Sequence, residues 1–336
     1  MVVESEMPEN QFKVRFVDND APIMQLPPRL TVVEAMAFKH CYHDLLQQPT
    51  QPTRIVLDFT ETRFIDSSGV GALVNNLKMS QSQGLKLVLR NVQSPVMAVF
   101  AMTGLDQVFT IEPVVFPTTH PQAQEPAATL PPDTHPSISS WVKRTLDIVG
   151  SLVGLGITGV LLLPIAIAIK LDSPGPIFFG QVRCGWLGRR FRIWKFRSMC
   201  NDAERLKDRI PNQATGAFFK NESDPRITQV GRFLRRTSLD ELPQFWNVLK
   251  GEMSLVGTRP PTPAEVEKYM IPQWQRLDVK PGMTGEWQVN GRSKVKDFED
   301  VIKLDLTYQE NWSLWYDIKL ILKTVLIVFH KDSGAV

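Results

Sequence analysis

Two adjacent carboxylates, Asp240 and Glu241, are the residues of this sequence whose types and spacing most suggest chemistry. They lie in the stretch TSLDELPQFWNVLKGEMSLVGTRP, with Arg235 shortly before them and Arg259 after them. An aspartate can attack phosphorus, because the acyl phosphate that it forms is itself reactive. Arginines hold phosphate oxygens through paired N–H donors, and a glutamate can hold Mg²⁺ beside a diphosphate. The pattern therefore indicates phosphoryl transfer.

The same residues also have a purely structural interpretation. Ser238 and Glu241 are three positions apart and match a capping box, in which the serine caps a helix and the glutamate bonds back to it. Carboxylates are common in a first helical turn, because the helix N-terminus carries a partial positive charge. Spacing alone does not decide between a capped helix and an active site.

Histidine and cysteine usage narrows the mechanism. Only His330 lies after residue 138, so a Ser/His or Cys/His nucleophile is not expected in that half. Cys41, Cys184 and Cys200 are far apart and lack CxxC spacing, which argues against a zinc site and indicates a reducing cytoplasm. Catalysis would fall to carboxylates, basic residues and a metal ion.

Charge divides the chain into two unlike halves. Residues 1–138 contain 9 lysines and arginines against 14 acids, a net charge of −5, whereas residues 139–336 contain 29 against 21, a net charge of +8. The basic half is the one expected to meet an anionic partner. Its excess is modest and fits phosphates and lipid better, so no nucleic-acid partner is expected.

A proline-rich stretch separates two predicted domains. Residues 112–140 read EPVVFPTTHPQAQEPAATLPPDTHPSISS, which is typical of a semi-extended linker. Before it, in residues 1–111, strand and helix patterns alternate and predict a small α/β sheet. Residues 141–336 form the second domain. No apolar leader is apparent at the N-terminus.

The second domain begins with 22 uncharged residues, 148–169, which as a helix would extend about 33 Å, enough to cross a bilayer. Positive residues flank the run on both sides, with Lys143 and Arg144 before it and Lys170 after it, which is awkward for a span. Pro164 inside the run invites a kink. We therefore expect a re-entrant helix, at about residues 143–171, that breaks at Pro164 and returns to the cytoplasmic face. A buried helix of a soluble protein is the alternative.

A second amphipathic segment, WSLWYDIKLILKTVLIVFHK, follows near the C-terminus. Its aromatic residues and two lysines are typical of a helix in the membrane interface. A core helix of the basic domain explains it equally well.

Residues 141–336 resemble the bacterial sugar transferases, which are monotopic polyprenyl-phosphate sugar-1-phosphate transferases. The similarity runs through KRTLDIVGSLVGL, KLDSPGPIFFGQVRCG, WKFRSM, GRFLRRTSLDELPQFWNVLKGEMSLVGTRP and PGMTGEWQVNGRS. The resemblance implies a phosphoglycosyl transferase on the cytoplasmic face of the bacterial inner membrane, in contact with its lipid. Its substrates would be a UDP-sugar and undecaprenyl phosphate, and the reaction would begin a surface glycan.

The resemblance also assigns roles to residues. Asp240 would be the nucleophile that carries the phosphosugar, Glu241 would assist it with Mg²⁺, and Lys195 of WKFRSM would lie in the active site. The substrate phosphates would be bound by Arg235, Arg259 and Arg292. Both Asp240 and Glu241 are candidate metal ligands.

In the first domain, the stretch FIDSSGVGALV resembles the signature of STAS domains, the anti-sigma-factor-antagonist fold. The resemblance implies a regulatory domain in which a kinase phosphorylates a serine at an uncovered helix N-terminus, Ser67 first and Ser68 second, and so changes the binding of a partner protein. A homodimer is a further candidate role for this domain. The structural interpretation is that Asp66 and these serines only cap the helix.

Together these patterns predict an α/β fold class, with a STAS-like domain joined to a helix-rich monotopic membrane domain. Two residues depart from the family pattern: Thr258 in VGTRP, where the turn could be looser, and Glu286, which could bear on sugar choice or a partner. The alternative function is a membrane-tethered STAS adaptor whose basic half is a non-catalytic anchor. The sequence names neither the sugar nor the glycan pathway.

Overall fold

The structure is a computed structural model of the 336-residue chain. It describes residues 3–5, 12–16, 21–47, 52–112, 134–206, 210–213, 221, 223–290, 295 and 297–329. The chain divides into two compact units. The first comprises Met1–Thr134 with Leu187–Arg189 and Met270–Asp278, and the second comprises His135–Trp186, Arg190–Tyr269 and Val279–Val336. Two short segments of the predicted second domain therefore belong to the first unit.

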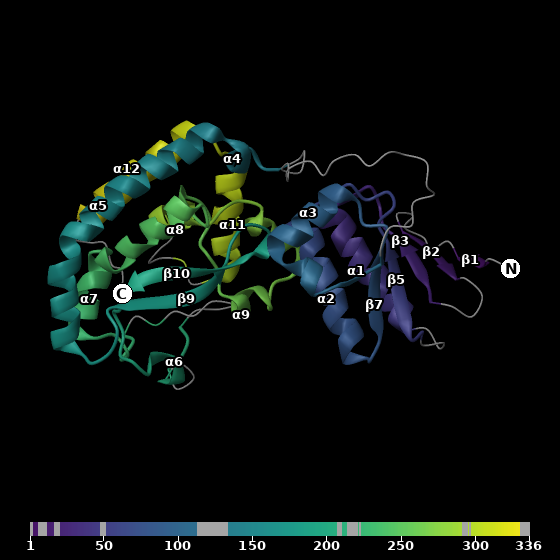
Figure 1. The fold of residues 1–336 in the computed structure, drawn as a ribbon, viewed down its shortest axis with the longest axis horizontal. Helices are drawn as coiled ribbons and strands as arrows, with labels where there is room; N and C mark the ends of the chain where they lie inside the picture. Colours follow the sequence, from purple (N-terminus) through teal and green to yellow (C-terminus); the bar gives the residue numbers. More distant parts are fainter. Residues whose placement is uncertain are drawn as a thin grey trace. The chain divides into compact units, whose positions relative to one another are not determined.

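A six-stranded mixed sheet organises the first unit (Figure 1). Its strands, in spatial order, are β1 (Val3–Ser5), β2 (Lys13–Phe16), β3 (Ile23–Gln25), β5 (Arg54–Asp58), β7 (Lys86–Arg90) and β8 (Thr110–Ile111). β2 pairs antiparallel with β1 and with β3, whereas the neighbours from β3 to β8 pair parallel. A short parallel pair, β4 (Arg29–Leu30) and β6 (Phe64–Ile65), lies outside this sheet. The central parallel strands are apolar and buried, as a covered parallel sheet requires.

Three helices connect the parallel strands: α1 (Val32–Leu46), α2 (Ser67–Ser82) and α3 (Ser94–Thr103), the last followed by the 3₁₀ helix η1 (Leu105–Gln107). Thr31 caps α1 through a capping box with Glu34. After α2, Gly84 adopts a φ of 71°, a left-handed conformation that glycine reaches without strain. The alternating α/β pattern predicted for this part of the sequence is confirmed.

The second unit is helix-rich, as predicted. Its α-helices are α4 (Pro136–Ser139), α5 (Trp141–Asp172), α6 (Ala203–Leu206), α7 (Gln229–Arg236), α8 (Phe245–Lys250), α9 (Pro263–Val266), α10 (Glu286–Asn290), α11 (Phe298–Glu310) and α12 (Leu314–Phe329). Two two-stranded sheets accompany them: the antiparallel hairpin of β9 (Phe178–Cys184) and β10 (Arg190–Phe196), and the parallel pair β11 (Ser254–Val256) and β12 (Gly282–Thr284). The 3₁₀ helices are η2 (Trp186–Gly188), η4 (Leu239–Gln244) and η5 (Ile271–Leu277).

Most of the predicted linker, residues 113–133, lies outside the described residues. Its last residues do not continue an extended chain, because Pro136–Ser139 form α4. His135 explains the helix: its Nδ1 pairs with the N–H and hydroxyl of Ser137, and its Nε2 pairs with the carbonyl oxygen of Gln309. The second unit therefore begins several residues before Trp141.

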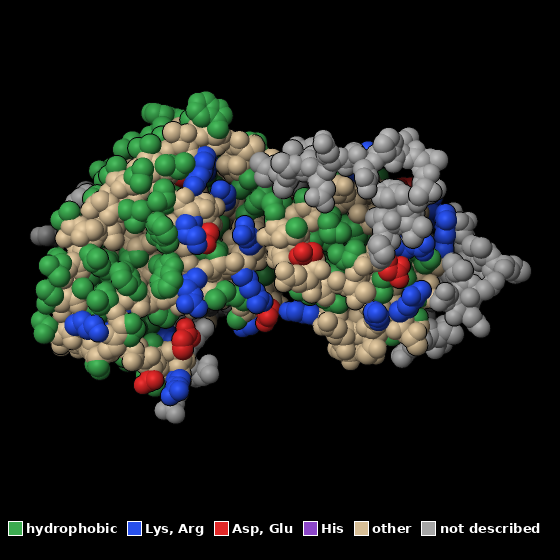
Figure 2. Space-filling view, viewed as in Figure 1, with side chains coloured by type: hydrophobic (Ala, Val, Ile, Leu, Met, Phe, Trp, Pro, Cys, Tyr) green, Lys and Arg blue, Asp and Glu red, His purple; other side chains and the backbone are tan. Residues whose placement is uncertain are grey.

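Helix α5 is long and apolar enough to cross a membrane. Many apolar side chains along it are exposed, among them Val153, Val160, Leu163 and Leu171. Apolar side chains also cover much of the face drawn over α5 and α7 (Figure 2). This exposure fits a membrane and disfavours the interpretation of α5 as a buried soluble helix. The predicted break at Pro164 is absent, because the helix continues from Trp141 to Asp172 and changes direction instead (Figure 1). A bend can accommodate the proline ring and the missing N–H without interrupting the helix.

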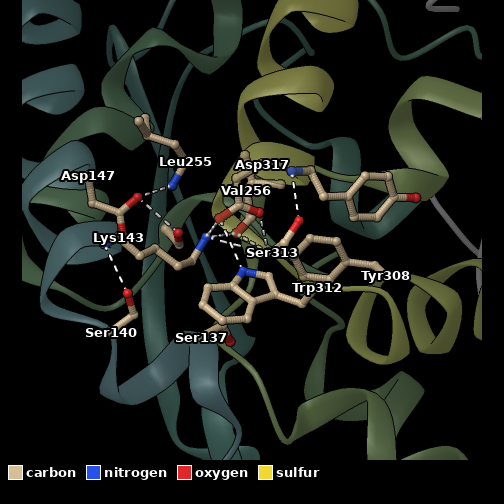
Figure 3. Close-up of polar contacts among 12 residues, drawn as sticks. Ser137, Ser140, Lys143, Asp147, Leu255, Val256, Tyr308, Trp312, Ser313 and Asp317 are labelled. Carbon is tan, nitrogen blue, oxygen red and sulfur yellow. Dashed lines mark hydrogen bonds and ion pairs between the residues drawn. The ribbon is translucent and has the colours of Figure 1, made fainter.

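The two positive residues in the first turn of α5, Lys143 and Arg144, bond into the unit, which corrects their interpretation as flanking charges of a membrane helix. Lys143 is buried, and its Nζ lies 2.6 Å from Oδ2 of Asp317 and 3.0 Å from the carbonyl oxygen of Val256 (Figure 3). The hydroxyl of Tyr308 and the indole N–H of Trp312 both donate hydrogen bonds to the Asp317 carboxylate. The Lys143 charge is thus neutralised inside the unit, and α5 is fixed to α12 and to the end of β11.

Two further charged residues near the start of α5, Arg144 and Asp147, bond to α8 and β11. Arg144 donates to the carbonyl oxygens of Val248 and Leu249 at the end of α8, at 2.8 and 2.6 Å. Asp147 accepts from the hydroxyl of Ser254 and the N–H of Leu255 in β11. The KRTLD motif therefore connects the apolar helix α5 to α8 and to β11.

Helix α12 combines both interpretations of its sequence. Asp317 and Leu320 are buried in the unit, whereas Trp315, Leu322, Val325 and Leu326 are exposed apolar side chains. One face is thus a core face, and the other is an apolar surface suited to a membrane interface.

Candidate active site

Asp240 lies in η4, a 3₁₀ helix rather than the capped α-helix that the capping box predicts. Ser238 takes a left-handed conformation, with a φ of 56°, and its side chain makes no capping bond. The turn is closed by backbone bonds instead, from Ser238 N–H to the Arg235 oxygen and from Glu241 N–H to the Ser238 oxygen. Asp240 is 5% exposed. The capping-box prediction is wrong, and this strained turn holds the aspartate in place.

Glu241 is held by a different partner, Lys195. The Nζ of Lys195 lies 2.7 Å from Oε1 of Glu241, and both side chains are partly exposed. Lys195 lies near the end of β10, opposite Phe179 of β9. The structure thus brings together the two carboxylates and the lysine that the sequence analysis selected, although 45 residues separate Lys195 from Asp240 along the chain.

Asn247, which the sequence analysis did not select, fixes the relation of β10 to the helical segment. Its side chain is fully buried, accepts from the N–H of Trp194 and donates to the carbonyl oxygen of Arg192. An asparagine side chain can extend a strand's bonding pattern in this way, because it offers both a donor and an acceptor. Asn247 follows η4 by about one helical turn and bonds to β10 just before Lys195. It therefore helps to hold Lys195 of β10 beside Glu241 of η4. No sequence signal distinguishes it from a surface helix residue.

Arg235, on α7, donates its Nε to the hydroxyl of Ser198, at 3.0 Å. Burial lowers the pKa of Arg235, whereas the nearby charges of Asp240, Asp224 and Glu241 raise it. Arg235 therefore lies in the field of both candidate carboxylates. A guanidinium stays charged in spite of burial, so it supplies a fixed positive charge beside Asp240.

Arg259 is held by Glu265, which the sequence analysis did not select. The guanidinium and the carboxylate form a two-pronged pair, with both N–O distances 3.1 Å. Burial raises the pKa of Glu265, but Arg259 and Arg183 outweigh it and bring the pKa to about 2. Glu265 is thus ionised under all ordinary conditions.

Arg183, from β9, is a second basic residue that the sequence analysis missed. It donates to the carbonyl oxygen of Pro260 and lies 3.9 Å from Glu265. Burial and the charge of Arg259 lower the pKa of Arg183 to about 10, against the opposing charges of Glu265 and Glu241. Two guanidinium groups therefore share one carboxylate, which leaves a net positive charge near Glu241. The only signal was its place in the motif FGQVRCG.

Two sequence departures have structural explanations. Thr258 is 1% exposed, and its carbonyl oxygen accepts the N–H of Gly282 at 2.8 Å, so the turn before Arg259 is not loose. Glu286 is buried, and it accepts bonds from the hydroxyl of Tyr316 and from the side-chain amide of Asn290. It holds α10 to α12.

Not every predicted residue can be placed. Arg292 lies outside the described residues. Among the residues that the structure describes, no three His, Cys, Asp or Glu side chains are grouped to hold a metal ion. The Asp240–Glu241 pair offers oxygen ligands, and Mg²⁺ in phosphoryl-transfer sites is often held by one or two carboxylates together with substrate phosphates.

The sequence analysis expected Ser67 and Ser68 at an uncovered helix end. In the structure this helix end is covered. Ser67 and Ser68 are both fully buried. Asp66 caps α2 by accepting the N–H of Gly69 at 2.8 Å, which fits the structural interpretation. Asp278 accepts the N–H of Ser67. Residues that are far apart in the sequence thus cover this helix end.

The folds and the site together define a two-part protein. One part is an α/β unit, and the other is a helix-rich unit with a membrane-compatible helix and a buried aspartate near basic residues. The chain belongs to the bacterial sugar transferase family, whose model matches residues 138–331. Residues 12–120 match the model of the STAS domain.

Curated relatives match the second part. The galactosyl transferase CpsE of Streptococcus agalactiae serotype III is 54% identical over 188 residues, which cover 55% of this chain and 42% of that protein. The undecaprenyl-phosphate galactose phosphotransferase of Salmonella typhimurium is 45% identical over 202 residues, 58% of this chain and 42% of that protein. This chain thus spans about two fifths of the length of these relatives.

The first part is similar to a solved structure of a putative anti-sigma factor antagonist from Thermotoga maritima. The two are 28% identical, and the match covers 30% of this chain and 86% of that one, with a TM-score of 0.26. The assignment of the STAS domain rests on the family model.

Proposed function

We propose that this protein transfers a sugar 1-phosphate from a UDP-sugar to undecaprenyl phosphate, through a covalent phosphosugar on Asp240. The observation that carries the proposal is the buried Asp240, held in a strained turn between Arg235 and the Lys195–Glu241 pair, in a member of the sugar transferase family. The printed names of the relatives include undecaprenyl-phosphate galactose phosphotransferase and UDP-glucose:undecaprenyl-phosphate glucose-1-phosphate transferase.

The reaction proceeds in two displacements. A carboxylate oxygen of Asp240 attacks the sugar-bearing phosphorus, and the bond from that phosphorus to the bridging oxygen breaks, so that UMP leaves with the electron pair. An oxygen of undecaprenyl phosphate then attacks the same phosphorus and releases the Asp240 carboxylate. Each displacement moves one phosphosugar and conserves charge overall.

The surrounding residues would stabilise the charge that develops on the phosphoryl oxygens. Arg235 lies in the field of Asp240, and Arg183 and Arg259 supply a net positive charge beside Glu241. Fixed positive groups in a partly buried site favour the transition state, because they need not reorganise during the reaction. Lys195 orients Glu241 through their ion pair.

The two adjacent carboxylates suit a Mg²⁺ ion that is held partly by the protein and partly by the substrate. Asp240 and Glu241 would hold it, with the remaining ligands supplied by diphosphate oxygens and water. When bound, it neutralises charge on the diphosphate and so makes UMP a better leaving group.

The membrane placement follows from α5. In this placement the helix enters one leaflet and, through its change of direction, returns to the cytoplasmic side, so that the protein is monotopic. The exposed apolar residues of α5 and α12 support this arrangement. Its test is the labelling of single cysteines, introduced at Trp141 and Leu171, with an impermeant reagent in sealed spheroplasts. Protection of both fits the proposal, whereas labelling of either one contradicts it.

Activity is tested by UMP release from membranes supplied with Mg²⁺, undecaprenyl phosphate and a panel of UDP-sugars. Release with one sugar, lost in Asp240→Asn, identifies the substrate and supports the reaction. No release with any sugar, from protein that is folded and membrane-bound, would favour the adaptor function.

A further inference from the structure

The N-terminus of α2 in the first unit is covered by residues 270–278 of the same chain, here called the docked segment. Asp278 accepts a hydrogen bond from the backbone N–H of Ser67, with 2.9 Å between the nitrogen and Oδ1. The first amides of a helix have no partner within the helix, and with the helix dipole they attract an anion. The Asp278 carboxyl group occupies that position here.

Trp274 supplies the apolar part of the contact. Its ring lies against Gly71, where an added Cβ would come within 2.5 Å of the indole. Gly71 is one helical turn after Ser67, so both lie on the same face of α2. The glycine therefore makes room for the tryptophan, and a larger residue there would displace it.

The helix end already holds two acidic side chains. Asp66 caps α2, and Asp278 lies beside it. Burial, and secondly the charge of Asp66, raise the pKa of Asp278 to about 7. Burial raises the pKa of Asp66 to about 6, although its bonds to the backbone of the helix oppose the shift. A third negative charge would be repelled strongly, because charges in such a partly desolvated place are poorly screened.

The hydroxyls of Ser67 and Ser68 lie beneath this contact. Both are buried, and the Ser67 side chain lies close enough to the Asp278 carboxyl to lower its pKa against the effect of burial. The side-chain cap of α2 is Asp66, and neither serine is accessible to an enzyme while the segment is docked.

We propose that residues 270–278 are the resident ligand of the STAS domain's α2 N-terminus, and that a negative charge at Ser67 displaces them. A phosphoryl group is one such charge: a protein kinase would transfer it from a nucleoside triphosphate to the Ser67 oxygen, with loss of the hydroxyl proton. The docked segment must leave before this transfer. Tyr269 and Val279, on either side of the docked segment, belong to the second unit.

The test is hydrogen exchange of the full-length protein in detergent micelles, followed by mass spectrometry of peptides from residues 270–278. Two of the amides to follow are those of Gln273 and Asp278, which bond within the segment. We expect Ser67→Asp to accelerate their exchange at least about tenfold, because repulsion opens the contact. Ser82→Asp, the same change at the exposed end of α2, is the matched control and should leave the exchange unchanged.

Gly71→Leu tests the same contact without adding charge. It should accelerate the exchange as Ser67→Asp does, because the new side chain occupies the place of the Trp274 ring. Unchanged exchange of the segment in Ser67→Asp would overturn the proposal. If that variant does not fold, unchanged exchange in Gly71→Leu would overturn it alone. No substrate takes part, so the result is independent of the transferase activity.

Discussion

At the scale of single residues, Glu265 keeps two guanidinium groups close together. It pairs with Arg259 and approaches Arg183, and neither arginine would tolerate the other in a buried place without it. The proposed phosphate site thus contains a carboxylate that no phosphate-binding pattern predicts. From the sequence, Glu265 could be assigned only to the capping box at the start of α9. It also has that role in the structure.

Glu265→Gln should destabilise the second unit by about 3 kcal/mol at neutral pH, since the variant loses the charge that compensates two buried cations. The sign of the pH dependence follows from the lowered pKa. The wild-type contribution is complete above the unfolded pKa of about 4.5 and is lost as the pH falls toward about 2. Urea unfolding at pH 7 and at pH 3 measures both. An equal stability difference at the two pH values would contradict this account.

Lys195→Met should lower the rate of UMP release by about a hundredfold or more, because Glu241 loses the partner that orients it. Lys195→Arg keeps the charge and should recover part of the rate. Lys250→Met, which removes a partly exposed ion pair with Glu252, is the control and should have little effect. Equal rates for Lys195→Met and the control would remove Lys195 from the site.

At the scale of elements, the start of α5 shows why charge patterns are hard to interpret from sequence. Lys143 and Arg144 look like flanking charges of a membrane helix, but both bond inward. Their partners, Asp317 and the carbonyl oxygens of α8, lie more than 100 residues away in the sequence. A long-range partner of this kind leaves no local signal, whereas the length and apolarity of α5 do.

Lys143→Met should destabilise the second unit by roughly 3–5 kcal/mol, because it leaves Asp317 buried without its countercharge. The double variant Lys143→Met with Asp317→Leu should recover a large part of the loss, since no unpaired charge remains. Lys170→Met, at the exposed end of the same helix, should be nearly neutral. Thermal unfolding in detergent compares the three. A double variant less stable than the single one would contradict the ion-pair explanation.

Sequence reasoning succeeded where the signal was local. The alternation of β3, α1, β5, α2, β7 and α3 is written in apolar periodicity and turn residues, and the structure confirms it. The capping box of Ser238 failed, because the same residues also satisfy a 3₁₀ turn in which Lys195 attracts the glutamate. Asn247 and Arg183 were missed because their roles depend on contacts across the fold.

At the scale of the whole molecule, the docked segment makes the state of the STAS domain depend on pH as well as on charge at Ser67. Asp278 and Asp66 both have raised pKa values, and the other charged group that affects Asp66 is Glu34. A carboxylate with a raised pKa binds its proton more tightly in the docked state. Docking is therefore strongest at low pH and weakens as the pH rises from about 4 to about 7.

Exchange of the docked segment, corrected for the intrinsic effect of pH, should thus be faster at pH 8 than at pH 5.5. Asp278→Asn keeps the shape and an acceptor oxygen but removes the titrating group, so its exchange should depend much less on pH. Asp44→Asn, on an exposed part of α1, serves as the control and should behave like the wild type. A wild-type segment that exchanges equally at both pH values would show that the two carboxylates do not strain the contact.

If Asp240 carries the phosphosugar, mass spectrometry of the intact protein will detect the covalent intermediate. The protein is incubated with Mg²⁺ and the preferred UDP-sugar in the absence of undecaprenyl phosphate, and then quenched in acid. We expect the mass to increase by one sugar phosphate, and the modification to map to Asp240. The increase should disappear when undecaprenyl phosphate is added, and it should be absent in Asp240→Asn. Lipid-linked product formed by Asp240→Asn at the wild-type rate would contradict the claim.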